Sequence, residues 1–295
     1  MKTRWSFLSA LALSISCWAT AFAGQYVRVS PDLELYYEEA GTGRPLIFVT
    51  GWTGTGEFFA PYQISHFSKK YHVLAYDPRS QGRSSLTLEG HTYVQHGKDL
   101  RAFMDALKLK DVILVGWSAG CYDVYGYFRT YATDNVSAFA CIDEMPRRVA
   151  AQKGDWADFG NASEVGGILK GVAYDRRALM NKFIPTMMQR KMTEDEVAWA
   201  MDQTQRTPDY VAVLLGADGA FADYTGEAKK IDGKIPVLNV LSEAHADAGK
   251  AWLAKNAPHS ETFVLGNHMM FREYPDKFNA ALDAFLAKPE LPSSK

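Results

Sequence analysis

The feature that most constrains the fold of this chain is a serine set between two glycines directly after an apolar run. Residues 116–120 read Gly-Trp-Ser-Ala-Gly, with the run 112–115 before them and a stretch of helical character, 121–131, after them. A sharp strand-to-helix turn forces the serine into a strained backbone conformation and requires small neighbours where other backbone crowds in. The turn lifts the hydroxyl of Ser118 clear of the sheet, so Ser118 is a candidate nucleophile.

Apolar runs of strand length recur along the chain and alternate with segments of helical spacing. Continuous runs such as 45–50 and 72–76 suit strands that are buried on both faces of a parallel sheet, whereas 26–29 and 33–38 alternate like antiparallel strands. Further predicted strands are 112–115, 137–142, 236–241 and 261–265, and predicted helices are 92–107, 121–131, 248–256 and 275–286. This alternation predicts an α/β fold with a doubly wound, mostly parallel sheet.

The pattern changes between residues 146 and 230, where no clear strand runs occur. Helical pieces rich in tryptophan and methionine take their place. We therefore predict a helical cap over 146–230, inserted into a sheet domain formed by 24–145 and 231–295. The mature length and a hydrophobic content of 47% are sufficient for one large core with such an insertion.

The first 23 residues have the three parts of a secretory signal peptide. Lys2 and Arg4 precede a short apolar core, and Ala-Phe-Ala at 21–23 provides a small-residue cleavage site. A lipoprotein signal acylated on Cys17 is the alternative. No later segment is long and apolar enough to cross a membrane, so we expect export to the periplasm or the extracellular space without stable membrane insertion.

Composition argues against several other classes of site. The net charge is −2, and lysines and arginines are scattered rather than gathered into the basic stripe that nucleic acid requires. We expect Cys121 and Cys141 to be free, buried thiols, with a disulfide as the alternative. His245 and Asp247 lack further ligands at a recognisable spacing, so we expect no metal site, and no cofactor. The sequence indicates no oligomeric state.

Four motifs in order resemble those of the α/β-hydrolase fold family, and the likeness covers nearly all of the mature sequence. They are Thr-Gly-Trp at 50–52, Asp-Pro-Arg-Ser-Gln-Gly-Arg-Ser at 77–84, the turn at 116–120, and Gly-Asn-His at 266–268. The first motif has threonine where the family usually has histidine, and Ser80 replaces a usual glycine in the second, which we interpret as structural. The resemblance implies an oxyanion hole formed by the backbone N–H groups of Trp52 and Ala119.

The resemblance also implies a base and an acid behind the serine. His268 follows the last predicted strand and would take and return the serine proton. The usual position for the acid, after the strand that ends at residue 241, has no aspartate at the expected offset. Relatives such as the haloalkane dehalogenases carry the acid after the preceding strand, which here favours Asp143. Glu243 is the main alternative, followed by Glu144 and Asp247.

A serine in this turn points to acyl transfer, because dehalogenases and epoxide hydrolases need a carboxylate nucleophile there. We therefore expect an exported serine hydrolase that cleaves a small to medium, largely apolar carboxylic ester through an acyl-enzyme on Ser118. Lactone hydrolysis, aminopeptidase activity and perhydrolysis use the same machinery, although an aminopeptidase would need acidic cap residues such as Glu164, Glu194, Asp195 or Glu196. A non-catalytic ligand-binding homologue is the alternative from another class.

Overall fold

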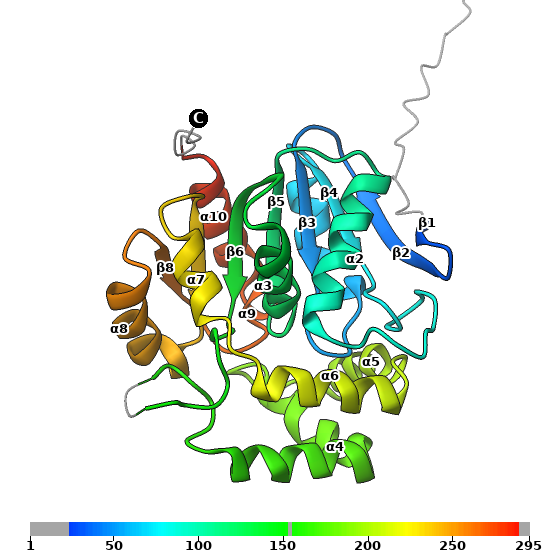
Figure 1. Ribbon diagram of the computed structural model, residues 1–295, viewed down its shortest axis with the longest axis vertical. Coiled ribbons are helices and arrows are strands. Elements are labelled where there is room, and N and C mark those ends of the chain that lie inside the picture. The colour runs from blue at the N-terminus through cyan, green and yellow to red at the C-terminus, as the bar shows by residue number, and fades with distance from the viewer. Residues whose placement is uncertain (1–23, 153–154, 289–295) are drawn as a thin grey trace, which may run out of the picture.

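A computed structural model describes residues 24–152 and 155–288 and shows an eight-stranded sheet between two layers of helices (Figure 1). The strands are β1 (Gln25–Ser30), β2 (Leu33–Ala40), β3 (Pro45–Val49), β4 (His72–Tyr76), β5 (Val112–Trp117), β6 (Val136–Ile142), β7 (Val237–Leu241) and β8 (Glu261–Val264). Their order is β1-β2-β4-β3-β5-β6-β7-β8. The first two pairings, β1 with β2 and β2 with β4, are antiparallel, and all later ones are parallel. The predicted α/β fold with a mostly parallel sheet is confirmed; the predicted signal peptide, 1–23, lies outside the described residues.

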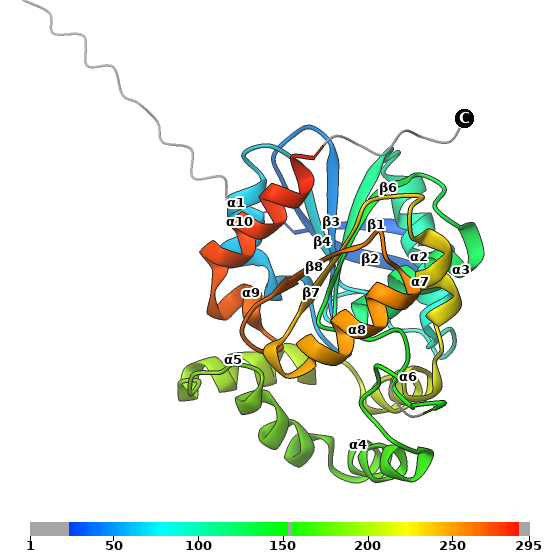
Figure 2. The same ribbon diagram turned by 90° about the vertical axis from the view of Figure 1, so that its left-hand side faces the viewer.

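Helices cover both faces of the sheet, so the inner strands are buried throughout. One face carries α2 (Tyr93–Ala106), α3 (Gly120–Tyr131), α7 (Thr225–Ile231) and α8 (Ala246–Asn256), and the other carries α1 (Ser65–Phe67), α9 (Met270–Glu273) and α10 (Pro275–Leu286) (Figure 2). Side chains of β5 alternate between the two cores: Val112 and Leu114 join the first, whereas Ile113 and Val115 join the second. This two-sided burial explains why the strand is an uninterrupted apolar run.

Helices occupy most of residues 162–231 in the segment between β6 and β7, whereas the described residues from 143 to 161 form no helix. The segment contains α4 (Ala162–Phe183), the short 3₁₀ turn η3 (Ile184–Thr186), α5 (Glu194–Gln205) and α6 (Asp209–Phe221), which lie together below the sheet in Figure 1. Helix α7 also falls within the range predicted for the cap, but it packs on α3, where Arg129 forms an ion pair with Glu227 at 2.9 Å. The part of this insertion that covers the sheet edge is therefore α4 to α6.

The loop after β4 serves a structural purpose. The Asp77 carboxylate accepts hydrogen bonds from the backbone N–H groups of Gly56 at 2.8 Å and Arg83 at 2.9 Å. Burial raises the pKa of Asp77 to about 6, against the lowering effect of these two bonds. Arg79 forms two hydrogen bonds of 2.7 Å to the carboxylate of Asp99 on α2. These contacts hold the chain that follows β3 and β4 in place at the edge of the sheet.

Two further observations concern the predicted thiols and membrane spans. Cys121 and Cys141 are both free and buried, and the Cys141 thiol donates a hydrogen bond to the Cys121 sulfur. Within 24–152 and 155–288, no helix combines the length and the apolar character needed to cross a bilayer.

Candidate active site

Ser118 occupies a strained turn that only glycine neighbours permit. Its φ angle is +53°, in the left-handed region that residues with a side chain rarely adopt. A Cβ atom on Gly120 would lie 2.3 Å from the carbonyl oxygen of Val49, and one on Gly116 would lie 2.8 Å from the backbone nitrogen of Cys121. Both glycines therefore allow close approach of backbone, as the sequence pattern indicates.

The loop after β3 passes directly beside this serine. A Cβ atom on Gly51 would lie 3.0 Å from the Cβ atom of Ser118. Within the described parts of the chain, the backbone N–H groups of Trp52 and Ala119 donate to no acceptor. The Trp52 indole N–H donates to the carbonyl oxygen of Ala212 on α6 at 3.0 Å, which ties this loop to the cap. Two unused donors beside a serine hydroxyl can hold a developing oxyanion.

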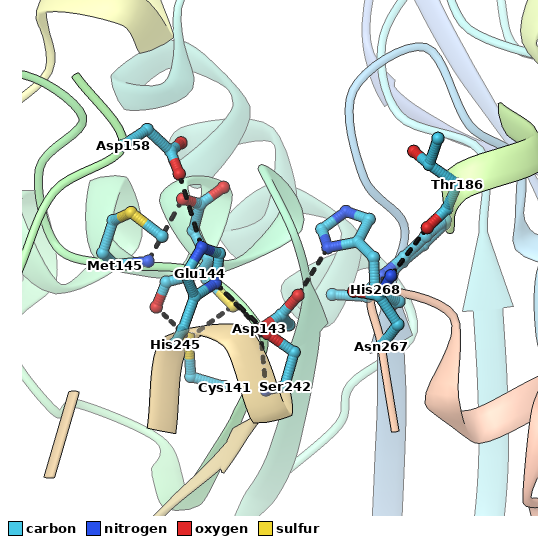
Figure 3. A network of polar contacts seen from close by, with 12 residues as sticks. Cys141, Asp143, Glu144, Met145, Asp158, Thr186, Ser242, His245, Asn267 and His268 are labelled. Atoms are coloured by element: carbon cyan, nitrogen blue, oxygen red, sulfur yellow. Dashed lines mark hydrogen bonds and ion pairs between the residues drawn. The ribbon is translucent and has the colours of Figure 1, made fainter. Parts of the chain in front are cut away.

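His268 lies in the loop between β8 and α9 and contacts Asp143 directly. Its Nδ1 atom lies 2.7 Å from Oδ2 of Asp143, as Figure 3 shows. The Trp117 indole N–H donates to the carbonyl oxygen of His268 at 2.8 Å, so the turn that carries Ser118 also positions the histidine loop. Asp143 follows β6 with a φ angle of +49°, and its N–H donates to the carbonyl oxygen of Val240 at 2.8 Å.

The second oxygen of Asp143 has two partners of its own. Oδ1 accepts a hydrogen bond from the backbone N–H of Ser242 at 2.9 Å and lies 3.3 Å from Nδ1 of His245 (Figure 3). Burial would raise the pKa of Asp143, but the hydrogen bonds from His245, His268 and Ser242 together lower it well below its usual value. This carboxylate is therefore ionised over the whole range in which histidine titrates.

His245 was not among the functional residues predicted from the sequence, where it was considered only as a metal ligand and set aside. A usable signal was its position four residues beyond β7, next to the end of β6 in a parallel sheet. Among the described residues, no group of three or more histidine, cysteine, aspartate or glutamate side chains could hold a metal ion, and this includes the surroundings of His245 and Asp247.

Within the described residues, the alternative acids form no hydrogen bond with His268. Glu243 and Asp247 are exposed, whereas Glu144 is buried and forms an ion pair with Arg148 at 2.6 Å. Within residues 24–152 and 155–288, Asp143 is the acid whose carboxylate hydrogen-bonds to His268.

One cavity of about 540 Å³ brings the predicted site residues together. Ser118, His268, Asp143, Trp52 and Ala119 all line it. The opposite wall comes mainly from apolar side chains on both halves of α4, which is kinked at Asp175: Val165, Ile168, Leu169, Val172, Met180 and Phe183. The charged side chains of Glu144, Arg148 and Asp158 also line the cavity. The acidic cap residues named as amine-binding candidates, Glu164, Glu194, Asp195 and Glu196, are not part of its lining. The cavity therefore suits a largely apolar ligand.

Comparison with known proteins places this architecture among hydrolases. A family model described as alpha/beta hydrolase fold matches residues 44–217, from the start of β3 into α6. An AB hydrolase superfamily protein of Bacillus subtilis (strain 168) is 33% identical over 270 residues, covering 89% of this chain and 98% of that protein. A non-heme chloroperoxidase of Kitasatospora aureofaciens is 26% identical over 272 residues, covering 87% and 97%. An esterase of Exiguobacterium antarcticum superimposes with a TM-score of 0.82 at 19% identity, covering 90% and 100%.

Proposed function

Since the chain belongs to the alpha/beta hydrolase fold family, we propose that it is a serine hydrolase that cleaves a small to medium, largely apolar carboxylic ester. The observation that carries the proposal is the 2.7 Å contact between His268 and Asp143 in the cavity that Ser118 also lines. A serine, a histidine and a carboxylate in this relation are the parts required for nucleophilic acyl transfer.

In this proposal, Ser118 Oγ attacks the ester carbonyl while Nε2 of His268 takes the hydroxyl proton. The oxyanion that forms accepts hydrogen bonds from the N–H groups of Trp52 and Ala119. The carbon–oxygen bond to the alcohol then breaks, and His268 returns its proton to the leaving alkoxide. Water attacks the acyl-enzyme with His268 again as base, and the acid product leaves with Ser118 restored. Asp143 holds the histidine tautomer and stabilises the imidazolium.

The substrate class follows from the cavity wall. Valine, leucine, isoleucine, methionine and phenylalanine side chains from α4 offer dispersion contacts and no hydrogen bonds to an acyl chain. A cavity of about 540 Å³ has room for a small or medium ester. We therefore expect a preference for uncharged acyl groups over charged ones.

Perhydrolysis is the second candidate, because a relative covering most of this chain is a non-heme chloroperoxidase. The same acyl-enzyme would react with hydrogen peroxide in place of water and release a peracid. Lactones would open by the same attack, with the alcohol remaining attached to the acyl group. The aminopeptidase alternative has less support, because the four acidic cap residues considered for it lie outside the cavity lining.

Turnover of a panel of chromogenic esters, with acyl chains of increasing length and one lactone, tests the proposal. We expect multiple turnovers by the wild type and a loss of at least about 10³-fold in kcat for Ser118→Ala. Wild-type turnover equal to that of Ser118→Ala across the whole panel would instead favour a ligand-binding protein. Adding hydrogen peroxide to the assay separates hydrolysis from peracid formation.

Export is part of the proposal as well. The basic start, short apolar core and Ala-Phe-Ala site at the N-terminus support removal of residues 1–23 by a signal peptidase. N-terminal sequencing of the protein recovered from the periplasm or medium tests this. A mature chain that begins at Gly24 supports export, and a chain that retains Met1 and stays in the cytoplasm contradicts it.

A further inference from the structure

We propose that His245 is a positioning residue for the catalytic acid: a second histidine that holds Asp143 from the side opposite His268 and adjusts its charge. The inference rests on the proposed function, because it concerns the acid of the same site. It is carried by the arrangement of two imidazoles on one buried carboxylate.

Each oxygen of the Asp143 carboxylate faces a different histidine, as Figure 3 shows. Oδ2 lies 2.7 Å from Nδ1 of His268, and Oδ1 lies 3.3 Å from Nδ1 of His245. The Ser242 N–H also donates to Oδ1, at 2.9 Å. A rotation of the carboxylate that turned Oδ2 away from His268 would break the contacts on the Oδ1 side at the same time. His245 and Ser242 therefore fix the orientation in which Asp143 meets His268.

A tight turn after β7 brings His245 to this position. Its N–H donates to the carbonyl oxygen of Ser242 at 3.1 Å, which closes the 3₁₀ turn η4 (Glu243–His245). Strand β7 pairs in parallel with β6, so the turn lies beside the end of β6, where Asp143 follows. Most of the His245 side chain is covered, with 35% exposed, and it lines the same cavity as Ser118.

His245 is surrounded mainly by negative charge. Asp143 faces Nδ1, and Asp158 faces Nε2 with its Oδ1 atom 3.8 Å away. Buried Glu144 adds a third carboxylate, and Arg148 is the nearby cation, pairing with Glu144 at 2.6 Å and with Asp158 at 3.2 Å. The hydrogen bond to Asp143 raises the pKa of His245; burial opposes this, and the charges of Asp143, Asp158 and Glu144 add to the rise.

Two states of the acid follow from this environment. Neutral His245 donates one hydrogen bond to Asp143. The full negative charge of the Asp143 carboxylate then acts on His268. Protonated His245 places a positive charge on the same carboxylate, so Asp143 stabilises the imidazolium of His268 less well during attack. The wild-type kcat/KM should therefore decline in two steps as the pH falls, where a single catalytic histidine would give one.

Two variants separate the hydrogen bond from the charge. His245→Asn places an amide N–H near the position of Nδ1 without a titrating group, and His245→Leu removes the donor while keeping an apolar side chain. We expect His245→Leu to lower kcat about 3- to 10-fold with KM changed less than about twofold, from loss of one partly exposed hydrogen bond to a charged group. His245→Asn should keep kcat within about twofold at alkaline pH and show a single step in its pH profile.

His259→Asn is the matched control, because His259 also faces an aspartate, Asp232, at 2.8 Å, but is 70% exposed and outside the cavity lining. It should leave the pH profile unchanged. A purely structural role for His245 would lower the melting temperature of His245→Leu and leave both kcat and the shape of the profile as in the wild type. That result, or superimposable profiles for wild type and His245→Asn, would overturn the inference.

A spectroscopic readout keeps this test separate from the proposed function. The low-field proton NMR signal of the His268 Nδ1–H reports its hydrogen bond to Asp143 and requires no turnover. We expect the signal to move in His245→Leu and to stay near its wild-type position in His245→Asn and His259→Asn. If no ester is hydrolysed, the proposed function fails, while a moved signal still supports His245 as the residue that positions Asp143. An unmoved signal in His245→Leu contradicts the inference even in an active esterase.

Discussion

Replacing the Asp143 carboxylate by an amide, in Asp143→Asn, tests how the tautomer of His268 is set. On the Oδ1 side the wild-type carboxylate receives the Ser242 N–H at 2.9 Å and faces His245 Nδ1 at 3.3 Å. In the variant this side would select the amide oxygen, because an amide NH₂ group cannot accept those donors. The NH₂ group would then face Nδ1 of His268.

That orientation of the amide reverses the tautomer of His268. An NH₂ group 2.7 Å from Nδ1 requires Nδ1 to accept, so the ring proton moves to Nε2 and His268 can no longer take the proton of Ser118. The same change in a well-characterised serine triad costs about 10⁴ in kcat. We expect a loss of about 10³ to 10⁴ here, equivalent to roughly 4 to 5.5 kcal/mol of transition-state stabilisation.

The assay is kcat/KM on a short-chain chromogenic ester, with Glu243→Gln as the matched control. Glu243 is the alternative acid from the sequence; its side chain is exposed and is not part of the cavity lining. Glu243→Gln should stay within about twofold of the wild type, and circular dichroism should show that both variants fold. An Asp143→Asn enzyme within tenfold of the wild type, or a larger loss in Glu243→Gln, would refute the assignment of the acid.

Three further predictions concern single substitutions. Gly51→Ala, whose Cβ would press on the nucleophile at 3.0 Å, should lower kcat/KM at least about tenfold, whereas Gly226→Ala, with nothing within 4 Å, should leave it unchanged in the same ester assay. Asp99→Asn breaks the buried pair with Arg79 and should lower the free energy of unfolding in urea by about 3 kcal/mol without changing KM. Because the pKa of His245 is raised by folding, its charge stabilises the protein fully below about pH 6.5 and less as the pH rises through the folded pKa; His245→Asn should therefore lower the melting temperature more near pH 5.5 than near pH 9.

Much of the fold was predictable because strong local patterns and global packing agree. The run 112–115 is apolar at every position because both faces of β5 are covered, and the glycines at 116 and 120 are required by contacts that a Cβ would block. The position of Asp143 was predictable because a residue just past a parallel strand faces the edge where ligands bind. The structure places Oδ2 of Asp143 2.7 Å from Nδ1 of His268.

The role of His245 was missed, because its contact with Asp143 joins two loops 102 residues apart, and its position just past β7 is the one sequence signal that pointed to it. The sequence also did not indicate whether α7 packs with the cap or on the sheet. Its helical pattern fits a cap helix or a sheet-layer helix equally well, and the ion pair between Arg129 and Glu227 that accompanies its packing on α3 is a tertiary contact. Sequence periodicity reports which face of a helix is buried and not what buries it.

Covalent labelling of Ser118 tests the central claim most directly. The wild type and Ser118→Ala would be treated with a serine-directed phosphonate, and the modified peptide identified by mass spectrometry. A strained serine that lines the same cavity as His268 and lies next to two unused backbone donors should give one adduct, on Ser118, and none on the variant. No adduct on the wild type, together with ester turnover by Ser118→Ala at the wild-type rate, would contradict the account.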